Sequence, residues 1–221
     1  YAVSLPTDQR VIRSLASGTL LRLRAPSGEL QNGTDPAALS GWWREALRQT
    51  AWLDIAAGPV AAGPAGADDA QLELTVADHG GTLATTLVVG NDRLLLASVA
   101  VAGRPLPTAI DELALRARTA LGDPVDPPPQ PVARIYSGDP VLVANCEAAL
   151  ADAHDGAFAS ALRRLQDVRR RDGGSAFLLE SMASITSMLG GATDARRLAD
   201  EALRAPDRSA PTTTHRLLRT L

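Results

Sequence analysis

The sequence predicts an α+β N-terminal domain, a small mixed sheet with two helices, followed by a separate all-α domain of helical repeats. Three observations predict it. Residues 71–101 contain three strand-like runs separated by short turns. Residues 123–131 hold five prolines in nine positions, the composition of an extended spacer. Gly156 and Gly190 then lie about 34 residues apart, the period of a repeated helix pair, inside a pattern that recurs around each of them.

The segment before residue 71 predicts a strand, a helix and a short second strand. Polar and apolar side chains alternate over residues 19–24, as in a half-buried strand. Asp35 and Pro36 form a favourable helix start, and the apolar spacing continues to about residue 50. Residues 52–55 predict the second strand, which ends at a loop rich in glycine and proline.

Two adjacent tryptophans lie on the first predicted helix. Trp42 and Trp43 point about 100° apart on such a helix, so both cannot be central to one buried stripe. We therefore expect one of them in the core. The other is a candidate for a partly exposed anchor that contacts a partner.

The next segment predicts an antiparallel meander and a second helix. Its strands are residues 71–77, 82–89 and 93–101, and glycine and asparagine occupy both turns. The helix covers residues 108–121, with Thr108 as its cap and acidic residues in its first turn.

The proline-rich segment divides the chain into residues 1–122, a linker over residues 123–132, and residues 133–221. Proline favours an extended, semi-rigid backbone, so we expect the two halves to be held apart with separate cores. A docking motif for a proline-recognising domain is the alternative interpretation of this segment.

The C-terminal part predicts tetratricopeptide-like repeats, whose helix pairs are about 34 residues long. The expected helices cover residues 140–154, 157–171, 176–189, 193–204 and 210–221. Small residues recur at the positions where paired helices touch: Ala149, Ala161, Val168, Ala183, Ala195 and Ala202. Two repeats alone are marginal. The N-terminal domain, a partner or residues beyond Leu221 must therefore cover their open faces.

The N-terminal half resembles the TolB N-terminal-like α/β domain of bacterial cell-envelope and signalling proteins. The resemblance covers residues 19–122 and is most specific at the final strands and the helix that ends in Ala120-Leu121-Gly122. The chain departs from the family at Leu72-Glu73-Leu74-Thr75, where a glycine is usual. The resemblance implies the sensory region of a membrane-anchored regulator, such as a CadC-type transcription regulator, an adenylate cyclase or a serine/threonine kinase.

This resemblance also implies a periplasmic or extracytoplasmic location, with a cytoplasmic scaffold as the alternative. The chain begins at Tyr1, and we expect it to be a fragment with an anchor or output domain elsewhere. The kinase loop motifs and a glycine-rich nucleotide loop do not occur in the sequence. The net charge of −3 gives no positive field that would favour nucleic acid or an anionic membrane surface.

We expect no catalytic residue, metal or cofactor in this chain. Cys146 falls among apolar neighbours, as a buried thiol does, and His79, His154 and His215 are too dispersed for a local metal site. The arginines at positions 163, 164 and 169–171 predict a solvated helix face. A site for an acidic peptide or a phosphate is the alternative.

The leading functional hypothesis is a protein or peptide partner bound on the concave face of the repeats, with self-association also possible. By helical position, this face consists of Asn145, Glu147, Asp152, Leu179, Met182 and Thr186. Substituting Asn145 by alanine or Met182 by aspartate is expected to weaken binding without unfolding the chain. The competing hypothesis is a small-ligand binder or an enzyme with a pocket between the sheet and the helices.

Overall fold

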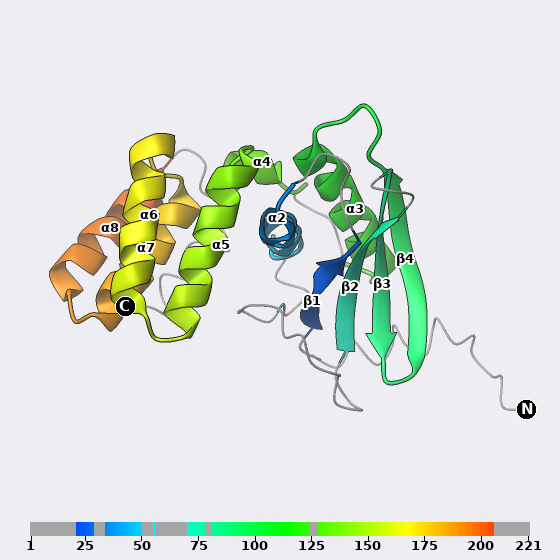
Figure 1. Ribbon diagram of the computed structural model, residues 1–221, viewed down its shortest axis with the longest axis horizontal. Coiled ribbons are helices and arrows are strands. Elements are labelled where there is room, and N and C mark those ends of the chain that lie inside the picture. Colours follow the sequence, from blue (N-terminus) through cyan, green and yellow to red (C-terminus); the bar gives the residue numbers. More distant parts are fainter. Residues whose placement is uncertain are drawn as a thin grey trace, which may run out of the picture.

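The computed structural model describes residues 21–28, 34–49, 55, 70–77, 81–123 and 128–205. They form a mixed α/β structure, in which the sheet with α3 lies on one side of α2 and the helices α5 to α8 lie on the other (Figure 1). The elements are β1 (Leu21–Ser27), α2 (Pro36–Leu47), β2 (Ala70–Ala77), β3 (Thr82–Val89), β4 (Asp92–Ala100), α3 (Leu106–Ala120), α4 (Val132–Ile135), α5 (Pro140–His154), α6 (Phe158–Asp172), α7 (Ala176–Met188) and α8 (Ala192–Arg204).

The sheet has the strand order β1-β2-β3-β4. β1 runs parallel to β2, and the other neighbours are antiparallel, which confirms the predicted mixed sheet and meander. Leu23, Leu72 and Leu87 stand opposite one another in a row that faces the core. Ile55 makes an isolated parallel bridge to Leu21, and the rest of the predicted short strand lies outside the described residues.

One face of the sheet packs against α2 and α3. Helix α3 begins at Leu106, two residues before the predicted start, and its N-cap is Pro105 without a side-chain hydrogen bond. The predicted capping role of Thr108 is therefore wrong. Proline is favourable in the first helical turn, so Pro107 allows the helix to begin at Leu106, a buried residue, earlier than a threonine cap would.

Helix α2 begins as predicted, because the Asp35 carboxylate accepts a hydrogen bond from the Ala37 N–H at 2.8 Å. The prediction of one exposed tryptophan is wrong, since Trp42 and Trp43 are each 1% exposed. The helix contacts β1 and α3 on one side and α5 on the other, so no broad face remains in water (Figure 1). The Trp42 indole N–H donates to the Ser137 carbonyl at 2.7 Å.

Helices α5 to α8 form two consecutive hairpins, with α5 packed on α6 and α7 on α8. Both first helices end in the same way. The Ala157 N–H donates to the Asp152 carbonyl, and the Gly191 N–H donates to the Thr186 carbonyl. Gly156 and Gly190 have φ of +81° and +83°, which confirms their predicted role as helix ends. The six small residues predicted at helix contacts are at most 4% exposed: Ala149, Ala161, Val168, Ala183, Ala195 and Ala202.

The two halves are in contact, and one hydrophobic cluster runs from the sheet into the helical hairpins. The expectation of separate cores is therefore wrong, whereas the exact domain boundaries stay a prediction. Gln49 and Gln130 exchange two hydrogen bonds, and the Asp111 carboxylate accepts the Val132 N–H. These contacts tie the end of the proline-rich segment and α4 to the N-terminal half.

Helix α2 packs against α5, so the N-terminal half covers one side of the first helical hairpin, as one of the three predicted alternatives proposed. The predicted helix over residues 210–221 lies outside the described residues. Within the described ranges, the helices are too short or too polar to cross a bilayer.

Candidate functional site

Three of the six residues predicted to bind a partner belong to α7, and all three are buried. Leu179 is 2% exposed, Met182 is 4% exposed and Thr186 is 9% exposed, so they do not line an open groove. Helix α7 has nine buried residues among its thirteen, which makes it the central helix of the hairpins. Helical position alone did not reveal this, because α7 is apolar around most of its circumference.

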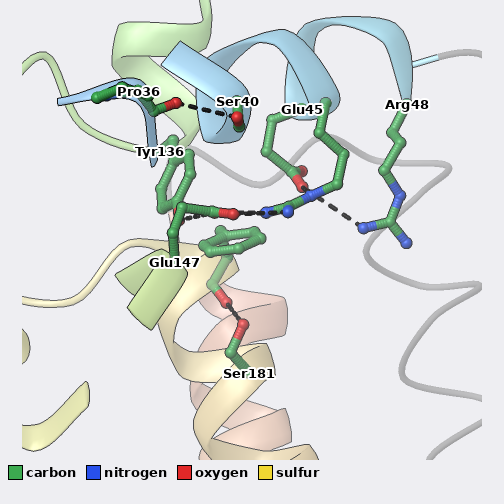
Figure 2. A network of polar contacts seen from close by, with 9 residues as sticks. Pro36, Ser40, Glu45, Arg48, Tyr136, Glu147 and Ser181 are labelled. Atoms are coloured by element: carbon green, nitrogen blue, oxygen red, sulfur yellow. Dashed lines mark hydrogen bonds and ion pairs between the residues drawn. The ribbon is translucent and has the colours of Figure 1, made fainter. Parts of the chain in front are cut away.

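Glu147 on α5 is held by residues of the chain itself. Its two carboxylate oxygens accept hydrogen bonds from Arg44 Nη1 at 2.7 Å and Arg44 Nη2 at 2.5 Å. The Tyr136 hydroxyl donates to Glu147 Oε1 at 2.6 Å. Figure 2 shows Glu147 and Tyr136 pointing toward the underside of α2, where Glu45 and the C-cap residue Arg48 also lie. This cluster, the Arg44–Glu147–Tyr136 network, joins the two halves.

Burial and the neighbouring charges shift the pKa values of Arg44 and Tyr136 in this network. Burial alone would lower the pKa of Arg44, but the charge and hydrogen bonds of Glu147, together with Glu45 and Tyr136, outweigh burial and raise the pKa. Burial, reinforced by Glu147, raises the pKa of Tyr136 well above its ordinary value, so the phenol stays a hydrogen-bond donor. A buried arginine that binds a carboxylate with two parallel hydrogen bonds suits a structural tie between the two halves.

The sequence signal for this network was a glycine inside a helix. A Cβ placed on Gly41 would come within 2.8 Å of Glu147 Oε1 and 2.9 Å of Val143 Cγ1. Glycine therefore permits the close approach of α2 to α5. A mid-helix glycine beside two tryptophans and an Arg-Glu pair could have indicated a helix that is covered on both sides.

Asn145 and Asp152, the remaining predicted residues, lie along the outer seam between α5 and α6, and both are partly exposed. The Asp152 carboxylate accepts hydrogen bonds from Ser160 Oγ at 2.9 Å and Arg164 Nε at 2.8 Å. These bonds from Arg164 and Ser160 hold the pKa of Asp152 below its ordinary value. The structure thus brings Asn145 and Asp152 together with the arginines of α6.

A depression of about 110 Å³ opens on this seam, here called the α5/α6 depression. Its lining consists of Leu142, Asn145, Arg164, Asp167, Val168 and Arg171. Leu142 and Val168 are almost fully buried and form an apolar floor, whereas the arginines are exposed. Typical cofactor and metabolite sites are several times larger, roughly 300 Å³ or more. The depression accommodates one small chemical group.

The histidines and the cysteine are the residues that the sequence analysis considered for metal ligation and thiol chemistry. No group of three or more His, Cys, Asp or Glu residues within the described ranges could hold a metal ion. Cys146 is buried, as predicted, and His154 is exposed at the end of α5. His79 and His215 lie outside the described residues.

No protein-family model matches the sequence, and no curated protein is significantly similar to it. The resemblance to TolB N-terminal-like domains and to tetratricopeptide repeats therefore stays a prediction. It rests on the strand and helix order of residues 19–122 and on the spacing of the two helix-ending glycines. The candidate site accordingly rests on its own geometry.

Proposed function

We propose that this chain is a non-catalytic, protein- or peptide-binding region of a bacterial membrane-anchored signalling protein. The observation that carries the proposal is the pair of stacked helix hairpins, which close on the equivalent glycines Gly156 and Gly190. Helical hairpin arrays expose long seams of side chains to partners and have no need of a deep pocket. The periplasmic or extracytoplasmic location belongs to the proposal, with a cytoplasmic scaffold as the alternative.

The binding surface that we propose differs from the concave face first expected. Helix α7 is buried, and α2 covers one side of α5, so the accessible side of the first hairpin is its outer seam with α6. Val141 near the start of α5 is 58% exposed, and its carbonyl accepts a hydrogen bond from the Asn145 amide. An exposed apolar side chain beside polar donors is the usual composition of a small peptide-binding surface.

The competing hypothesis places a ligand pocket between the sheet and the helices. Contacts at that boundary count against it, because the side chains of Trp42, Arg44 and Glu147 occupy the space between α2 and α5. These buried side chains are already hydrogen-bonded within the chain, so they are not available as polar groups that converge on a ligand.

A matched pair of surface variants tests the proposal. Val141→Asp changes an exposed residue of the helical half, and Leu95→Asp changes a similarly exposed residue on β4. Both should fold, since aspartate is favourable in the first turn of α5 and Leu95 is 61% exposed. The wild-type chain and both variants are immobilised, exposed to a cell-envelope extract of the source bacterium, and compared by mass spectrometry.

We expect a protein that binds the wild type and Leu95→Asp directly but binds Val141→Asp at least about tenfold more weakly. Direct binding is verified with the purified partner. A partner that binds the wild type and Val141→Asp but not Leu95→Asp would place the binding surface on the sheet. Retention of no protein by the wild type, together with a co-purifying small molecule, would overturn the proposal in favour of the ligand-binding hypothesis.

A further inference from the structure

The α5/α6 depression presents hydrogen-bond donors that are not used by any residue the structure describes. Arg171 takes part in no ion pair within the described ranges, although Arg164, Arg169 and Arg170 on the same helix each have an acidic partner. Arg164 gives its Nε to Asp152, and its Nη atoms make no hydrogen bond to any described residue. The Asn145 amide spends one N–H on the Val141 carbonyl and retains a second.

Although these donors are exposed, contacts within the fold hold them in position. Ser160 and Arg164 both donate to Asp152, which fixes the Arg164 guanidinium at one end of the seam. Arg164 and Arg171 are seven residues apart, so they lie on the same face of α6 about 10 Å from one another. Asn145 lines the same depression from α5.

The lining also selects among anions. Leu142 and Val168 form an apolar floor, which suits the methylene groups that carry a side-chain carboxylate. Asp167 stands at the rim and is paired with Arg170, and a nearby carboxylate repels a dianion more than a monoanion. A volume of about 110 Å³ is enough for one acidic side chain and too small for a nucleotide or other cofactor.

We propose that the α5/α6 depression binds the carboxylate of one aspartate or glutamate in a partner peptide, with Arg171, Arg164 and Asn145 as donors. Arginine is suited to this task because its planar guanidinium matches a carboxylate with two parallel hydrogen bonds. This inference rests on the proposed peptide-binding function and names the chemistry of the partner at that site.

The test begins with random dodecapeptides displayed on phage and selected on the immobilised wild-type chain. Recovered peptides are synthesised with a fluorescein label, and their affinity is measured by fluorescence anisotropy for the wild type, Arg171→Gln and Arg163→Gln. Arg163 is the matched control, because it is exposed on α6 but does not line the depression. Thermal unfolding confirms that both variants fold.

We expect the peptides to be enriched in aspartate and glutamate. Arg171→Gln should weaken binding at least about tenfold, and Arg163→Gln should change it less than about twofold. Replacing the acidic residue of the peptide by its amide should lower the affinity by a similar factor. When both changes are made, the loss of affinity should be much smaller than the product of the two separate losses.

Two results would overturn the inference. Peptides that bind without an acidic residue, or whose affinity is unchanged in Arg171→Gln, would remove the carboxylate site while leaving peptide binding intact. A selection that recovers no peptide at all would overturn both the site and the peptide-binding form of the proposed function. Added salt provides a further check, because a charge-assisted contact on an exposed surface weakens as ionic strength rises.

Discussion

Helices α2 and α6 have similar lengths, but they use their charged residues in opposite ways. On α2 even Arg44 and Glu45 are buried, at 6% and 4% exposure. Among the α6 side chains whose burial the structure describes, the buried ones form one stripe of Ala161, Leu165 and Val168, and most of the arginines face water. The charges of α2 therefore join the two halves of the molecule, whereas those of α6 are accessible to a partner.

The physical basis of this difference is desolvation. A buried guanidinium has lost its water and depends on a fixed carboxylate, so removing its partner leaves a charge that nothing compensates. An exposed guanidinium keeps its water, and a surface ion pair contributes little to stability. If this comparison is correct, substitutions along the Arg44–Glu147–Tyr136 network should cost far more stability than substitutions on α6.

The largest effect is expected for Glu147→Leu. This change removes the carboxylate that accepts from Arg44 and Tyr136, and should lower the free energy of unfolding by about 3–5 kcal/mol. Urea unfolding monitored by tryptophan fluorescence measures it. The double variant Arg44→Met with Glu147→Leu should recover most of the loss, because it removes the guanidinium that Glu147→Leu leaves without its carboxylate, while Glu45 keeps its ion pair with Arg48. A loss below about 1 kcal/mol for Glu147→Leu would mean that the network does not join the halves.

A smaller effect is expected for Trp42→Phe. Phenylalanine keeps most of the apolar packing but cannot donate to the Ser137 carbonyl, which lies in a buried part of the chain. We expect a loss of about 1–2 kcal/mol in the same urea experiment. Trp43→Phe is the matched control, because the Trp43 indole nitrogen has no hydrogen-bond partner among the described residues. An equal loss for both variants would contradict the importance of the Ser137 contact.

The burial of Asp111, on α3, is intermediate between that of the α2 charges and that of the α6 charges. Burial raises the pKa of Asp111 to about 6, although the hydrogen bond from the Val132 N–H lowers it. The folded chain therefore keeps this proton at a pH where the unfolded chain has released it, above about pH 4. Consequently the contribution of Asp111 to stability falls as the pH rises from about 4 to 6.

Asp111→Asn should remove this pH dependence, because the amide stays neutral and its oxygen can still accept the Val132 N–H. At pH 7 the variant should be more stable by about 1 kcal/mol, a value reduced to allow for solvent screening of a partly exposed group. Thermal unfolding between pH 4 and pH 7 measures the slope for both proteins. Parallel stability profiles would show that the Asp111 pKa is not raised in the folded chain.

The smallest effect is expected for Arg170→Gln on α6. Arg170 pairs with Asp167 one turn away, and both side chains are more than half exposed. We expect the free energy of unfolding to change by less than about 0.5 kcal/mol, as is usual for surface pairs. A loss comparable to that of Glu147→Leu would remove the distinction between α2 and α6.

Much of the local structure could be predicted from the sequence. The periodicity and turn residues predicted the three-strand meander and helix α5, and Asp35 and Pro36 marked the start of α2. The short helix α4 was not predicted, because four residues after a run of prolines carry no periodic signal. The burial of Leu179, Met182 and Thr186 was also missed, and with it the position of the accessible surface.

What the sequence by itself determined is local: the strands, the helices and the two glycine-terminated hairpins follow from periodicity, caps and positive φ, all of which act within a few residues. Only the tertiary structure decided that α2 is covered on both sides and that Glu147 meets Arg44, 103 residues away along the chain. The physical reason is that burial depends on which surfaces meet. Helical position specifies which residues share a face of a helix but not which element packs against that face. The α5/α6 depression could therefore be identified only from the tertiary structure, in which α2 covers one side of α5 and α7 is buried.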